Sequence, residues 1–168
     1  MARSPSLRAD AILFLYVALF ALGRSFEPAV KAGLRAAGTL PPSREAARNL
    51  ATLAMGELVG QNPRSLQNAI GFADRAIAIA AGHGTGGDAL ARVVRGRARL
   101  SLGDGGGMDE LEAGLDDVQR YESGTVAIGT TMSFAGALHH WRGPAAELKA
   151  RQETEALAAS RGCSSSPL

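Results

Sequence analysis

Apolar residues recur along this chain at three- and four-residue steps, and glycines interrupt these stretches at regular distances. The clearest stretch places its apolar residues on one helical stripe: Leu66, Ala69, Ile70, Ala73, Ile77, Ala80 and Ala81. A spacing close to 3.6 residues predicts an amphipathic helix, whereas a half-buried strand would alternate apolar and polar residues. Residues 125–128 could form a short strand, but they open directly onto another helical stretch. We therefore expect an all-α protein.

A helix, a glycine-marked turn and a second helix follow one another four times. The turns fall at Gly23, Gly60, Gly103 and Gly143. The corresponding hairpins are expected over residues 9–37, 44–82, 88–121 and 125–161. A period of roughly 40 residues is typical of stacked helical hairpins. The sequence therefore predicts an α-solenoid of about four antiparallel helical hairpins, which offers a surface for partners rather than a catalytic pocket.

Residues that start helices stand where the hairpins should begin. Ser43 and Asp88 are good N-caps, and Pro144 suits the first position of the last helix. We expect a flexible N-terminus over residues 1–8, one helical-repeat domain over residues 9–162 and a disordered tail over residues 163–168.

The uncharged run from Ala11 to Gly23 has three interpretations. It can be the buried first helix, a secretory signal preceded by Arg3 and Arg8, or a membrane anchor, although a span needs about 20 residues. Apolar residues continue at helical spacing beyond the run, at Phe26, Val30 and Leu34. That continuation favours a first helix and a cytoplasmic protein, with a secreted or membrane-anchored protein as the alternative.

Composition narrows the class further. Of the 168 residues, 46% are hydrophobic, which excludes wholesale disorder, and the net charge of +2 is too small to imply direct binding of nucleic acid. The one cysteine, Cys163, excludes a disulfide within the chain and fits a reducing cytosol.

The candidate chemical motifs are weak. The glycine-rich segments 82–87 and 103–107 lack the Lys-Ser/Thr ending of a phosphate-binding loop, so we expect hairpin turns there. His139 and His140 are adjacent and would point about 100° apart on a helix, with one of them packing near Trp141. We expect no metal site and no cofactor.

Two nucleophiles also fall short of a catalytic pattern. Ser133 has no strand leading into it, and Cys163 has no ordered base near it in sequence. We therefore expect no catalytic residues and no enzymatic activity.

The most useful charges form a basic stripe of Arg92, Arg95 and Arg99 at helical spacing. The following helix carries many acidic residues, namely Asp109, Glu110, Glu112, Asp116 and Asp117. The arginines can either form ion pairs with these acids inside one hairpin or line the inner face of the array and bind an acidic partner. They are the candidate partner-binding residues.

Several segments resemble a known family. Residues 22–34, LGRSFEPAVKAGL, resemble the helix-turn-helix of a tetratricopeptide repeat. Residues 92–115, RVVRGRARLSLGDGGGMDELEAGL, are similar to a segment in the C-terminal repeat regions of large actinobacterial signalling proteins. Those proteins place an adenylate/guanylate cyclase or DNA-binding module and an ATPase module ahead of the repeats. Residues 142–146 and 159–162 resemble the last hairpin of the same region.

The resemblance implies a non-catalytic, tetratricopeptide-like interaction or regulatory module of a bacterial signal-transduction or transcription-regulatory system. It implies a protein partner, such as an ATPase or cyclase module, and it transfers no catalytic residue, because those lie outside the matched region. The chain departs from the family in its last helix, where Lys149, Arg151 and Gln152 replace apolar packing residues.

Overall fold

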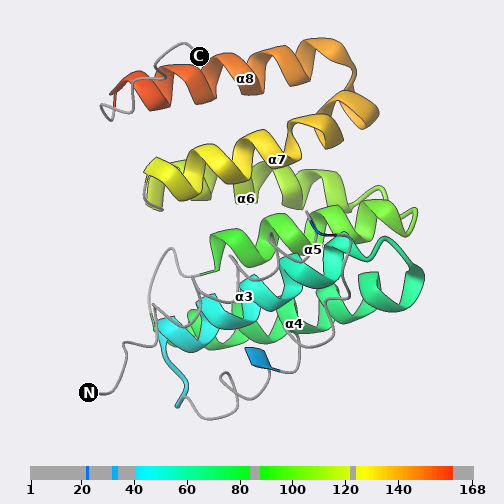
Figure 1. The fold of residues 1–168 in the computed structure, drawn as a ribbon, viewed down its shortest axis with the longest axis vertical. Helices are drawn as coiled ribbons and strands as arrows, with labels where there is room; N and C mark the ends of the chain where they lie inside the picture. Colours follow the sequence, from blue (N-terminus) through cyan, green and yellow to red (C-terminus); the bar gives the residue numbers. More distant parts are fainter. Residues whose placement is uncertain (1–21, 23–31, 34–40, 84–87, 122–123, 161–168) are drawn as a thin grey trace.

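The computed structural model describes residues 22, 32–33, 41–83, 88–121 and 124–160, and every regular element among them is a helix (Figure 1). The elements in chain order are α3 (Arg44–Val59), α4 (Pro63–Ala81), α5 (Ala89–Ser101), α6 (Gly107–Tyr121), α7 (Gly124–Arg142) and α8 (Pro144–Ser160). The expectation of an all-α protein is confirmed for this part of the chain, and residues 125–128 belong to α7 rather than to a strand.

The predicted first hairpin lies outside the described residues except for Leu22, Ala32 and Gly33, and so do residues 1–8 and 163–168. The run over 11–23 therefore keeps its three interpretations. None of the helices in the described ranges is long and apolar enough to cross a membrane.

The helices pair in chain order, α3 with α4, α5 with α6 and α7 with α8. These pairs coincide with the hairpins expected over 44–82, 88–121 and 125–161. Figure 1 shows the pairs stacked along the long axis of the molecule. Helix α5 packs on both α3 and α4, whereas the last hairpin joins the rest mainly through α6 and α7.

Local signals set most of the helix boundaries. The Ser43 hydroxyl accepts the Ala46 N–H at 3.1 Å, as expected of an N-cap. Gly143 has a φ of 86°, which suits glycine, and Pro144 then opens α8. Asp88 takes the N-cap position of α5 but makes no capping hydrogen bond: its backbone lies in the αR region rather than in the extended region of Ser43, and its carboxylate pairs with Arg92.

The predicted apolar stripes form the core. Helix α6 buries all four residues that its spacing marks, namely Met108, Leu111, Leu115 and Val118. Three apolar residues at helical spacing are nevertheless exposed: Ala81 of the predicted stripe, Leu102 at 40% and Trp141 at 43%. All three lie at helix ends, Ala81 as the last residue of α4, Leu102 as the C-cap of α5 and Trp141 one residue before α7 ends, where fewer neighbours cover them.

Helices α5 and α6 approach each other at their backbones. A Cβ on Gly96 would lie 2.6 Å from the Gly107 carbonyl oxygen, and one on Gly114 would lie 2.8 Å from the Val93 nitrogen. These distances are shorter than Cβ contacts in real proteins, so the hairpin packs this closely only because glycine stands at these positions.

Candidate functional site

The arginine stripe of α5 is occupied by acids of the same chain. Arg92 pairs with Asp88 at 2.7 Å and approaches Asp117 at 3.6 Å. Asp117 lies on α6, so this contact joins the two helices of one hairpin. At Arg92, the structure therefore shows the ion pairs that were one of the two alternatives for the stripe.

Arg95 and Arg99 share the carboxylate of Glu110. Arg95 also contacts Asp74 of α4 at 2.6 Å, and Arg99 contacts Glu110 at 3.0 Å and Asp104 at 2.8 Å. Burial lowers the pKa of Arg95, but its hydrogen bonds to Glu110 and Asp74 outweigh burial and raise that pKa overall. The hydrogen bond to Asp104, followed by the one to Glu110, raises the pKa of Arg99.

These contacts bear on the role predicted for Arg92, Arg95 and Arg99. An acidic partner would have to displace acids already in place, and each exposed pair contributes only about 0 to 1 kcal/mol. Binding of an acidic partner by the stripe stays a prediction. The structure brings Glu110 and Asp117 to the arginines, whereas Asp109 and Glu112 contact Arg142 of the next hairpin at 3.5 Å and 3.1 Å.

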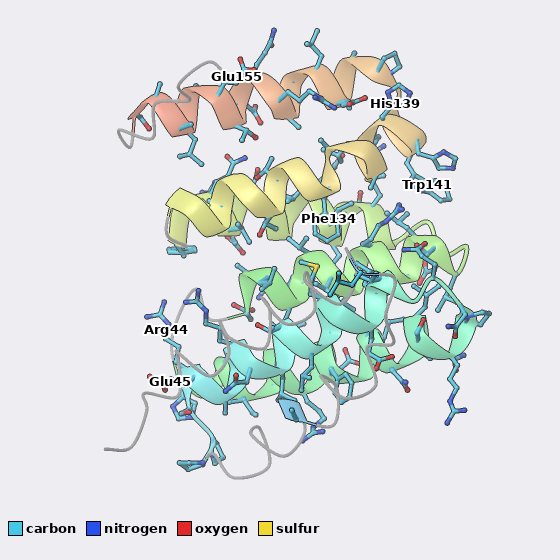
Figure 2. The ribbon with its side chains drawn as sticks, in the orientation of Figure 1. Arg44, Glu45, Phe134, His139, Trp141 and Glu155 are labelled. Carbon is cyan, nitrogen blue, oxygen red and sulfur yellow. The ribbon has the colours of Figure 1, made fainter. Side chains whose placement is uncertain are left out.

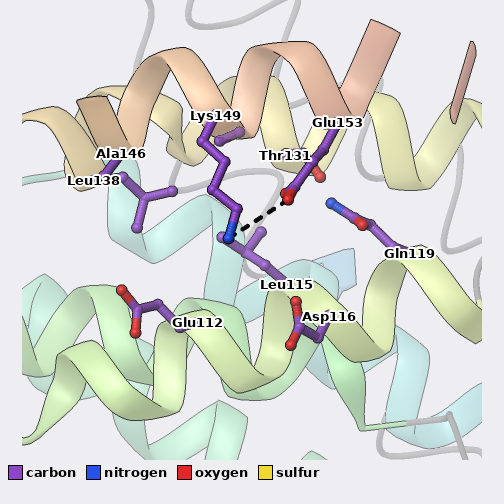
Figure 3. Close-up of a pocket in the computed structure, with 10 residues that line it drawn as sticks. Glu112, Leu115, Asp116, Gln119, Thr131, Leu138, Ala146, Lys149 and Glu153 are labelled. Atoms are coloured by element: carbon purple, nitrogen blue, oxygen red, sulfur yellow. Dashed lines mark ion pairs between the residues drawn. The ribbon is translucent and has the colours of Figure 1, made fainter. Parts of the chain in front are cut away.

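A groove of about 310 Å³ lies where α6, α7 and α8 meet (Figure 3). Its lining residues are Glu112, Leu115, Asp116, Gln119, Thr131, Leu138, Ala146, Lys149, Ala150 and Glu153. Leu115, Leu138 and Ala150 are buried and give the groove an apolar wall. The remaining lining is mostly polar, so the groove joins an apolar surface to a charged one.

One polar group in the groove lacks a partner. Thr131 is 1% exposed, and its Oγ1 has no hydrogen-bond partner among the described residues. Figure 3 shows Thr131 of α7 and Glu153 of α8 among the residues that line the groove. A buried hydroxyl without a partner is unfavourable, so a donor that reached Thr131 Oγ1 from the groove would satisfy a group that water does not reach in this structure.

The charges of the groove are predominantly acidic. Glu112, Asp116 and Glu153 face a single cationic lining residue, Lys149. Glu112 is matched by Arg142, whereas Asp116 makes no ion pair with any residue that the structure describes. Lys149 Nζ lies 3.7 Å from Glu153 Oε1, and the Lys149 side chain is 76% exposed.

The histidine pair lies in the last turn of α7, where Figure 2 labels His139. His140 meets Trp141 edge-on, with ring centroids 5.4 Å apart, which confirms the packing expected for one of the two. His139 Nδ1 lies 2.6 Å from Glu147 Oε2 of α8. Within the described ranges, no His, Cys, Asp and Glu side chains gather into a group that could hold a metal ion.

Two further candidates from the sequence are Ser133 and Cys163. Ser133 lies inside α7, and Cys163 lies outside the described residues. Both glycine-rich segments adjoin helix ends. Gly103 has a φ of 89° between α5 and α6, and Gly82 is the C-cap of α4. Residues 84–87 lie outside the described residues. Gly103 thus has the turn role that the sequence predicts.

The apolar and charge patterns of the sequence do not predict the groove. They place Asp116 among the acids that follow the arginine stripe, and Lys149 is a departure from the resembled family. The signal that could have pointed to Thr131 is a hydroxyl residue in the apolar stretch of α7. Comparisons of this chain with protein-family models, with curated proteins and with solved structures found no match.

Proposed function

We propose that this chain is a non-catalytic helical-repeat module that binds a segment of another protein in the groove formed by α6, α7 and α8. The observation that carries the proposal is this groove, which combines an apolar wall, an acidic rim and the unpartnered hydroxyl of Thr131. A site whose polar groups already have hydrogen-bond partners would gain less free energy from a ligand, since those hydrogen bonds would have to break first.

The arrangement of the hairpins supports a repeat module. Three hairpins follow one another, and α5 packs on both helices of the hairpin before it. Solenoids of the tetratricopeptide kind build their core in this manner, by burying each unit against its neighbour. We extend this arrangement to an α-solenoid in which the predicted hairpin over 9–37 is the first unit.

The groove is a better binding site than the arginine stripe. Each arginine of the stripe contacts two acids of the chain, whereas Asp116 in the groove has no cation among the described residues. The placement of the module in a bacterial signal-transduction or transcription-regulatory system, with an ATPase or cyclase module as partner, is supported by the resemblance of residues 92–115, 142–146 and 159–162.

Site-specific photo-crosslinking with a peptide panel tests this function. A photoreactive residue replaces Lys149 in the groove or, as a control, Gln67, which is exposed on α4. The panel contains basic, acidic and uncharged peptides of equal length. We expect saturable crosslinking of at least one class at position 149 and none at position 67. Failure of every class to crosslink saturably at position 149 would refute the proposed function.

A further inference from the structure

We propose that the groove binds a lysine side chain of the partner protein, and that the chain's own Lys149 occupies this place until the partner displaces it. This inference rests on the proposed function and names the chemistry that the groove selects. Its evidence is the kind of polar atoms in the groove, the helices that supply them, the apolar wall and the position of Lys149.

The groove offers hydrogen-bond acceptors from three helices. Asp116 lies on α6, Thr131 on α7 and Glu153 on α8. An ammonium group has three donors and no acceptor, and its donors can turn toward acceptors on different sides. A guanidinium is a rigid planar fork that suits one carboxylate approached edge-on. Acceptors spread over three helices therefore favour lysine.

The size and wall of the groove suit one long side chain. Its volume of about 310 Å³ lies at the low end of the range for small-molecule sites, roughly 300–1,000 Å³. Leu115, Leu138 and Ala150 can pack against the methylene stem of a lysine while its ammonium stays with the polar atoms. A partner would thus insert a single residue rather than a bulky cofactor.

Lys149 shows where such an ammonium would be held. Figure 3 shows its side chain extending from α8 into the groove, with the ion pair to Glu153 marked by a dashed line. This pair is long, at 3.7 Å, and the Lys149 side chain is 76% exposed, so it contributes little stability. A partner lysine that also reaches Asp116 and Thr131 would displace it.

The experiment titrates the folded chain with acetyl-Ala-Ala-Lys-Ala-Ala-amide and follows backbone amide shifts by NMR. Matched peptides carry norleucine or arginine in place of lysine. We expect saturable shifts at residues 112–119, 131 and 146–153, with about tenfold weaker binding of the norleucine peptide. Equal shifts from the norleucine peptide, or tighter binding of the arginine peptide, would overturn the assignment of lysine.

Three variants locate the interaction. Asp116→Asn should weaken binding of the lysine peptide severalfold. Glu155→Gln is the matched control, because it makes the same change in net charge. It should leave binding unchanged, since Glu155 lies on the outer side of α8 (Figure 2). Lys149→Met should strengthen binding severalfold by removing the internal competitor. Equal effects of the two acid substitutions, or unchanged affinity in Lys149→Met, would contradict the proposal.

The failure of this inference differs from failure of the proposed function. If acidic or uncharged peptides crosslink at position 149 and the lysine peptide does not bind, the lysine assignment is wrong and the interaction module stands. If no class of peptide binds, both are wrong. Because Asp116 and Lys149 are exposed, their variants are expected to fold, and a dispersed amide spectrum confirms this for each one.

Discussion

Substitution of Gly96 by alanine should destabilise the fold although it raises helix propensity. The added Cβ would lie 2.6 Å from both the Gly107 carbonyl oxygen and the Leu111 nitrogen. Both contacts are backbone atoms, so no side chain can turn away and the two helices must separate. Overpacking costs about 1–3 kcal/mol, and contacts this short favour the upper end. The alanine recovers about 1 kcal/mol of helix propensity, which leaves a net loss of about 2 kcal/mol.

Gly71 provides the matched control. It lies in the interior of α4, is exposed, and no described atom would come within 4 Å of its added Cβ. Gly71→Ala should therefore stabilise the chain by up to about 1 kcal/mol. Urea unfolding followed by circular dichroism measures both variants. A Gly96→Ala variant as stable as Gly71→Ala would refute the close packing of α5 on α6.

Three further substitutions follow from the buried and paired polar groups. Thr131→Val should stabilise the chain by about 1 kcal/mol, because it replaces an unpartnered buried hydroxyl by a methyl group. The same substitution should weaken binding of the lysine peptide in the NMR titration. A destabilised variant would show that the hydroxyl has a partner. Arg97 is half-buried and makes no ion pair with any described residue, and burial lowers its pKa. Arg97→Met should therefore raise the free energy of unfolding by a few tenths of a kcal/mol. A clearly lower free energy in urea unfolding would contradict this. The hydrogen bond from Arg151 lowers the pKa of Glu147 below its ordinary 4.5, so the stability from this group is present above that value and lost as the pH falls through the lowered pKa. The Tm of Glu147→Gln should therefore fall less than that of the unaltered chain between about pH 6 and about pH 3, and equal falls would count against the pair.

The sequence predicts the helices well because their signals are local. Periodic apolar residues mark the buried face of α6, and Ser43 and Pro144 mark two of the helix starts. Trp141 is exposed although it continues the apolar spacing of α7, because exposure at a helix end depends on the neighbouring elements, which periodicity does not record.

Features that depend on docking between hairpins were harder to predict. Asp74 of α4 pairs with Arg95 of α5, so the acids facing the stripe do not all come from one hairpin. The groove exists only because α8 and α6 approach α7 from two sides. Gly96 and Gly107 allow close packing of α5 on α6, a contact that the apolar periodicity does not reveal.

The measurement that tests the central claim most directly is the ratio of dissociation constants for the norleucine and lysine peptides. We predict a ratio of about ten for the unaltered chain, which falls severalfold in Asp116→Asn and is unchanged in Glu155→Gln. A ratio near one in the unaltered chain would contradict the claim that this groove recognises a lysine of its partner.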